Sequence, residues 1–203
     1  MRHPLRIALV VAAALIGCAP QHDEPQQEGP LPAEVHANSL ACTLRGPTTI
    51  KVGESPALLI DVTNRTQFPM NLVYCLYGSN SKARYPHCYF KVTGPKPKSE
   101  PMPTEWCGVL DTLRPENFAR VAPGGSFNPY GGPAQGQELL PGQFVSGGEY
   151  HLRFVYSTDG ADLDLWLGAA YPGIRIDRPE LQRLLDRVPR TTVESNEITL
   201  RVE

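Results

Sequence analysis

The stretch Gly147–Thr158, GGEYHLRFVYST, has the clearest strand pattern in this chain of 203 residues. Its large apolar side chains occupy every second position, as in an extended strand with one buried face. These side chains are Tyr150, Leu152, Phe154 and Tyr156. His151 alternates with them and is expected to face solvent or a neighbouring edge. We therefore predict a central strand over this stretch, with its aromatic face in the core.

Short strand patterns bounded by turn residues continue on both sides. They cover 39–45, 48–53, 56–64, 69–78, 86–94, 118–126 and 191–203. One amphipathic helix is predicted within 177–188, where Asp177 and Glu180 have the spacing of a capping box and the apolar side chains share one stripe. The chain also has 21 prolines and 18 glycines, a composition that favours a loop-rich β protein over a helical bundle.

An immunoglobulin-like β-sandwich accounts for this order of elements. Such a sandwich needs only about 100 residues, so the surplus goes into long connections at 95–114, 128–146 and 159–190. Gly148-Glu149-Tyr150 opens the strongly alternating strand and resembles the tyrosine-corner position of these sandwiches. We predict an all-β, immunoglobulin-like β-sandwich over residues 37–203, with long loops and one short helix before the last strand.

The N-terminus has the pattern of an exported protein. A short basic start precedes the apolar run Ile7–Ile16, which is about half as long as a membrane-spanning helix and suits a signal peptide over residues 1–17. The next residues, Leu15-Ile16-Gly17-Cys18, resemble the lipobox of bacterial lipoproteins. That resemblance implies cleavage before Cys18 and acyl chains on this cysteine, which would hold the protein in a membrane. An ordinary secretory signal with an incidental cysteine is the alternative.

Two further features refine this N-terminal prediction. Ala19 stands where an aspartate would favour retention at the inner membrane, so the resemblance implies the outer membrane. Residues 18–36 are polar and rich in proline, with almost nothing to bury. We expect them to form a disordered tether between the lipid and the domain.

With Cys18 assigned to lipid, the remaining cysteines form an even set in an oxidising compartment. Cys75 and Cys88 flank a predicted turn symmetrically, so a regular hairpin would place them opposite each other and within disulfide reach. We therefore prefer the pairs Cys75–Cys88 and Cys42–Cys107, although four cysteines allow three pairings.

Several segments together resemble a known group of proteins. They read GESPALLIDVTNRTQFPMNLV, YPHCYFKVTGP, WCGVLDTL, PGGSFNPYG, YHLRFVYST and VESNEITLRV, and they span most of Gly53–Val202. They are similar to a group of uncharacterised bacterial immunoglobulin-like lipoproteins. The resemblance implies the sandwich fold; it implies no activity, and it carries over no functional residue.

Aromatic residues beside the long connections are the candidate ligand contacts. Trp106, Phe127 and Tyr130 could stack on a sugar or anchor a protein partner, or they could plug the ends of the sandwich. We expect Trp106 to be a plug because Cys107 would pin it against a sheet. Tyr130, which has no close apolar neighbours in the sequence, is the better candidate for contact.

The sequence contains little that indicates a catalytic site. It has no GxSxG, HExxH or CxxC motif, so we predict neither an enzyme nor a metal or other cofactor. Once Arg2 and Arg6 leave with the signal peptide, 19 basic residues become 17 against 21 acidic ones, which argues against binding to nucleic acid.

We expect a non-catalytic binding or structural domain in the bacterial envelope, attached to the membrane by lipid, with an envelope protein or polymer as partner. The alternatives are a protease inhibitor that presents a loop, and a metal-handling or enzymatic protein whose site is formed by distant loops.

Overall fold

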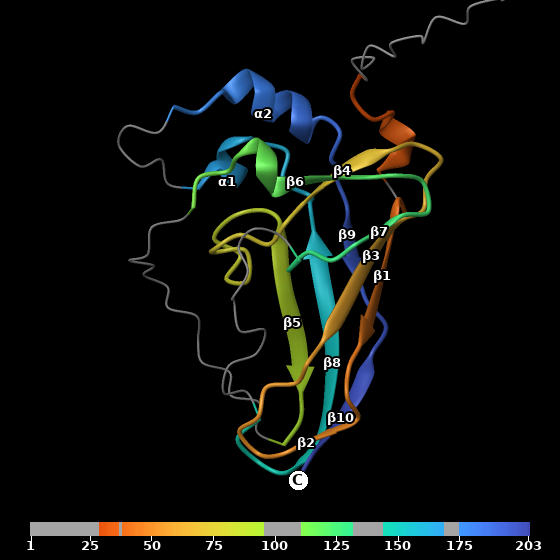
Figure 1. Ribbon diagram of the computed structural model, residues 1–203, viewed down its shortest axis with the longest axis vertical. Helices are drawn as coiled ribbons and strands as arrows, with labels where there is room; N and C mark the ends of the chain where they lie inside the picture. The colour runs from red at the N-terminus through yellow and green to blue at the C-terminus, as the bar shows by residue number, and fades with distance from the viewer. Residues whose placement is uncertain (1–28, 37, 96–110, 132–143, 169–174) are drawn as a thin grey trace, which may run out of the picture.

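The computed structural model describes residues 29–36, 38–95, 111–131, 144–168 and 175–203. Within these ranges the chain forms three β-sheets and a small group of helices (Figure 1). The predicted lipidation site Cys18, the cysteine Cys107 and Trp106 lie outside the described residues, as do the signal peptide and most of the tether.

The larger sheet is built around the strand predicted from the alternating stretch. Its strands are β2 (Thr49–Ile50), β10 (Ile198–Val202), β8 (Gly148–Ser157) and β5 (His87–Thr93) in that order, with β9 (Thr192–Glu194) also pairing with β8. Strand β8 is antiparallel to β5, β9 and β10, and β2 is parallel to β10. The alternating aromatics of β8 are all fully buried, as predicted.

A second sheet faces the first across the core. It consists of β1 (Leu40–Arg45), β3 (Leu59–Asn64) and β7 (Ser126–Phe127), with β3 in the middle. Leu44 and Val62 from this sheet share one apolar cluster with Phe154 and Leu200 from the larger sheet. The two sheets therefore pack face to face, and the prediction of a mostly β, sandwich-like domain is confirmed.

One end of the sandwich is covered by a helical cap, which we define as α1 (Asp164–Leu167), α2 (Arg178–Leu185) and the short 3₁₀ helix η2 (Pro115–Asn117). The cap lies beside a two-stranded sheet formed by β4 (Met70–Val73) and β6 (Phe118–Val121), at the end away from the C-terminus (Figure 1). A second apolar cluster joins the cap to β4. Its buried members are Val73, Leu76, Leu113, Leu163, Trp166, Leu167, Leu181, Leu185 and Val188.

Two local predictions are confirmed in detail. The hydroxyl of Tyr150 donates a hydrogen bond to the carbonyl of Ser146, four residues upstream, at 3.0 Å, which is the bond expected of a tyrosine corner. In α2, the carboxylate of Asp177 accepts the backbone N–H of Glu180 at 3.1 Å and so caps the helix. The apolar stripe of α2 packs into the second cluster.

Three fold predictions need correction. The segments around Cys75 and Cys88 do not form a hairpin, because β4 pairs with β6 and β5 pairs with β8. The predicted last strand is divided into β9 and β10. Between them, the side-chain hydroxyl of Ser195 accepts the hydrogen bond from the backbone N–H of Phe154 that a backbone carbonyl would accept in a continuous strand. A second α-helix, α1, is present; one turn is too short to show helical periodicity in a sequence.

Residues 29–36, which we call the N-terminal strap, are part of the folded domain rather than free tether. Leu31 and Val35 are buried in the main core, each 7% exposed. The backbone N–H of Leu31 bonds to the carbonyl of Asp186, and the guanidinium of Arg187 bonds to the carbonyl of Gly29 at 2.8 Å. The predicted domain start at residue 37 is therefore too late: two apolar residues among the prolines suffice to dock this segment.

The remaining edge of β1 is closed by one side chain. Asn196 lies between β9 and β10 and bonds to both backbone groups of Leu44. Its carbonyl oxygen accepts the Leu44 N–H at 2.9 Å, and its amide donates to the Leu44 carbonyl at 3.0 Å. The side chain thus replaces a neighbouring strand at this point of the sheet.

Candidate functional site

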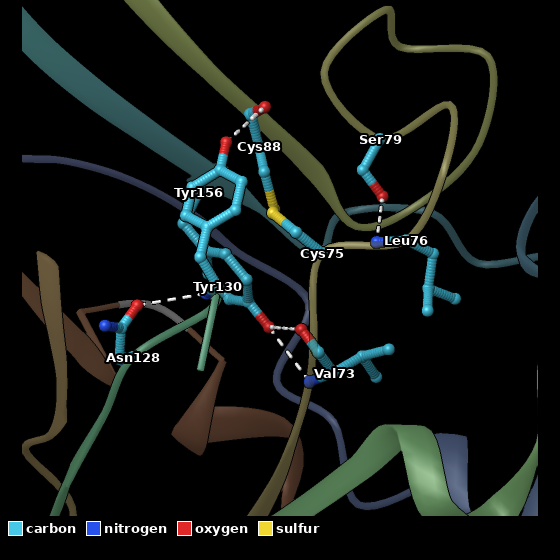
Figure 2. Close-up of a disulfide and its surroundings, with 8 residues drawn as sticks. All are labelled: Val73, Cys75, Leu76, Ser79, Cys88, Asn128, Tyr130 and Tyr156. Atoms are coloured by element: carbon cyan, nitrogen blue, oxygen red, sulfur yellow. Dashed lines mark hydrogen bonds between the residues drawn. A yellow bond between two sulfur atoms is a disulfide. The ribbon is translucent and has the colours of Figure 1, made fainter. Parts of the chain in front are cut away.

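The predicted disulfide Cys75–Cys88 is present, with a Cα–Cα distance of 6.2 Å. It does not lie across a hairpin. Cys75 follows β4 and Cys88 belongs to β5, so the bond links the cap side of the molecule to the edge of the larger sheet (Figure 2). The pairing was therefore predicted correctly, although the hairpin from which it was predicted is not present.

A buried tyrosine beside the disulfide makes a second cross-link between the same parts. The hydroxyl of Tyr156 accepts the backbone N–H of Val73 at 3.0 Å and donates to its carbonyl at 2.9 Å (Figure 2). Both residues are fully buried. Burial raises the pKa of Tyr156, so the hydroxyl keeps the proton that it donates. One side chain therefore satisfies two backbone groups that water cannot reach.

Phe127 and Tyr130, predicted as possible ligand contacts, belong to the core region. Phe127 is 5% exposed and packs near the ring of Tyr74. Tyr130 is half-buried against Phe154, and its hydroxyl donates to the carbonyl of Cys88 at 3.4 Å (Figure 2). Phe127 therefore lies in the core, whereas Tyr130 packs against the core and keeps part of its side chain exposed. The apolar neighbours of Tyr130 come from distant strands, which is why the local sequence did not show them.

Cys42 has a free thiol in the described part of the chain. It is half-buried on β1 and packs against the main core. Burial, together with the charge of Asp61, raises its pKa to about 12. Such a thiol is a poor nucleophile near neutral pH. Its predicted pairing with Cys107 stays a prediction.

A buried arginine holds the cap together. Arg84 is 2% exposed, and its guanidinium donates to the carbonyls of Asp111 and Trp166. Burial lowers its pKa to about 10, against the opposing charge of Asp111. Trp166 is fully buried and donates its indole N–H to the carbonyl of Gly160 at 3.0 Å. These contacts fix α1 and the segment before η2 in one arrangement.

The cap contains a cleft of about 420 Å³, a volume within the usual range for small-molecule sites. It lies between the segment that leads into η2 and the start of α2. Its lining is apolar at Leu113, Pro115, Ile176 and Leu181, and charged at Arg114, Arg175, Asp177 and Glu180, with Thr112 completing it. The sequence did not predict this cleft, because its two walls are about 60 residues apart in the chain. The charged run before α2 was the one local signal of it.

The exposed face of the larger sheet carries a ladder of ion pairs. Glu194 contacts Lys91 and Arg153, and Glu197 contacts Arg153 and His151. Hydrogen bonding to Lys91 is the first cause of a lowered pKa for Glu194. Pairs of this exposed kind contribute little free energy. His151 faces outward, as predicted, and this face is best explained as a solvated surface.

Two negative observations apply to the described residues. They contain no cluster of three or more His, Cys, Asp or Glu side chains arranged to hold a metal ion. Among the same residues, no helix has both the length and the apolar character required to cross a bilayer.

Comparison with known proteins assigns no family. No protein-family model matches the sequence, and no curated protein matches it. A structural match is native alpha-2-macroglobulin from Escherichia coli, in a crystal structure that spans the residues from domain MG7 to the C-terminus. The sequences are 15% identical, and the TM-score is 0.30. The match covers 81% of this chain but only 16% of the macroglobulin chain, so it assigns neither a family nor an activity.

Proposed function

We propose that this chain is a bacterial lipoprotein whose immunoglobulin-like domain is a binding module rather than an enzyme. The observation that carries the proposal is the sequence Leu15-Ile16-Gly17-Cys18 at the end of a short apolar run. A run of that length suits a cleaved signal peptide. Acyl chains on Cys18 would then anchor the mature protein, and Ala19 favours the outer membrane over the inner one.

The immunoglobulin-like assignment is supported by the two face-to-face sheets and by the tyrosine corner at Tyr150. A disulfide at Cys75–Cys88 also suits an exported domain. The binding role is supported by the cleft in the cap, at one end of the sandwich. An envelope protein or an envelope polymer is the class of partner that such a location offers.

The strap makes the geometry of anchoring specific. It leaves the domain at the end opposite the C-terminus (Figure 1). Because Gly29 is already held by Arg187, only the residues from Cys18 to Gly29 remain as tether. Fully extended, eleven residues span at most about 40 Å. In the proposed lipoprotein the end of the domain that carries the strap therefore stays within about 40 Å of the lipid.

Lipid attachment is tested directly by mass spectrometry of the mature N-terminus. Wild-type protein should carry acyl chains on Cys18 and fractionate with membranes. Cys18→Ser should yield either an uncleaved precursor or a released soluble form. A mature N-terminus at residue 18 on a membrane-bound protein without lipid mass would contradict the proposal.

A further inference from the structure

The cleft in the cap holds unpaired charges of both signs. Arg175 and Glu180 line the same cleft, yet among the described residues neither side chain has an ion pair or a side-chain hydrogen bond. The other two charged lining residues, Asp177 and Arg114, already have partners. Asp177 caps α2, and Arg114 lies 3.7 Å from Glu116.

Both charges belong to the same wall of the cleft, at and just before the start of α2. Arg178 in the first turn of α2 forms an ion pair with Asp164 of α1 at 2.8 Å, and both of these side chains are more than half exposed. Leu113 and Leu181, which are nearly fully buried, line the same cleft. A carboxylate and a guanidinium therefore line one cleft together with apolar residues, and no ion pair joins the two charges.

We propose that this cleft binds a short zwitterionic peptide or amino acid. The ligand's ammonium group would pair with Glu180, its carboxylate would pair with Arg175, and its side chain would lie against the apolar lining residues. A guanidinium suits a carboxylate because it can donate two parallel hydrogen bonds to it. A purely anionic ligand fits less well, because the carboxylate of Glu180 would repel it. This inference rests on the binding role proposed above but not on the lipid anchor.

The test uses the full mature protein in detergent micelles, with the dipeptide alanyl-leucine as the probe and calorimetry as the readout. We expect a Kd of roughly 1 mM or tighter, which corresponds to a few net polar contacts. N-acetylation of the probe removes its ammonium charge, and C-amidation removes its carboxylate. Each change should weaken binding to the wild type by about tenfold, the loss expected for about 1.4 kcal/mol.

The variants assign each end of the ligand to one residue. Glu180→Gln should lower affinity for the free dipeptide by about tenfold and no longer distinguish it from the acetylated form. Arg175→Gln should do the same for the amidated form. Arg183→Gln is the matched control, because it lies on the same helix but outside the cleft, and it should bind like the wild type.

Three results would overturn the inference. The first is no heat of binding at about ten times the expected Kd. The second is binding that neither Glu180→Gln nor Arg175→Gln changes, and the third is binding of inorganic phosphate without binding of the dipeptide. Circular dichroism checks the fold of each variant; if one variant is unfolded, the other still decides the matter with its own modified probe. Correct lipidation of Cys18 alongside any of these results would leave the anchor intact and reject only the ligand.

Discussion

The hydroxyl of Tyr156 is a single group on which two buried backbone groups depend. Changing Tyr156 to Phe keeps the ring in the core but removes the partner of both the N–H and the carbonyl of Val73. Neither group can turn to water, because Val73 and Tyr156 are both fully buried. The variant therefore leaves one donor and one acceptor unsatisfied rather than simply losing a hydrogen bond.

The size of the effect follows from those two groups. An unsatisfied buried donor or acceptor costs about 1–3 kcal/mol, so the two groups left by Tyr156→Phe should lower the free energy of unfolding by about 2–6 kcal/mol. A typical domain has about 5–15 kcal/mol in total. For a domain of this size, each kcal/mol lowers the melting temperature by about 2–4 °C. The melting temperature should therefore fall by roughly 4–24 °C.

Thermal unfolding followed by circular dichroism, with the disulfide intact, measures this loss. Tyr130→Phe is the matched control, because its hydroxyl makes one long bond, 3.4 Å, to the carbonyl of Cys88. That variant should lose no more than about 1 kcal/mol. If Tyr156→Phe were as stable as Tyr130→Phe, the reasoning from the two buried groups of Val73 would be wrong.

Other predictions concern the cap, a histidine and the cysteines. Asp177→Ala removes the cap of α2 and should cost about 1 kcal/mol in denaturant unfolding; an unchanged midpoint would argue against it. Burial, helped by Lys82, lowers the pKa of His87, so the folded state favours the neutral ring and should lose stability as the pH falls below about 6.5. His87→Gln should lose less between pH 7.5 and 5 in parallel melts, and an equal loss would exclude this histidine as the cause. With a pKa of about 12, a reduced Cys42 should react with Ellman's reagent at pH 8 only after unfolding; prompt reaction in the native protein would contradict its burial.

The sequence was most informative where a pattern is local and repeats. The alternation in β8 predicted both the strand and its buried face, since a period of two places side chains on one side of a sheet. The spacing of Asp177 and Glu180 predicted the start of α2 for the same kind of reason, because an N-cap contacts residues three positions ahead. The Tyr150 hydroxyl bond was likewise accessible, since donor and acceptor are four residues apart.

Features made by distant segments were not accessible in the same way. The burial of Tyr130 depends on Phe154 and Cys88, which the sequence separates from it. The cleft depends on packing η2 against α2, and no local pattern encodes that distance. Likewise, the only large apolar residues of the strap are Leu31 and Val35, and the arginine that holds Gly29, Arg187, is far from it in the sequence.

The contact between Asn196 and Leu44 limits how strand β1 can pair with a neighbouring copy of the protein. With the proposed lipid anchor, copies of this protein would be confined to a surface, where they would meet often and an open strand edge would invite pairing between chains. In β1 the amide of Asn196 already occupies the hydrogen-bonding groups at the outer side of Leu44. Cys88 lies on β5, at one edge of the larger sheet. Its backbone N–H donates a hydrogen bond to the carbonyl of Ser79, and its carbonyl accepts one from the hydroxyl of Tyr130. One edge of each of the two facing sheets is thus blocked at one residue against pairing with a second chain.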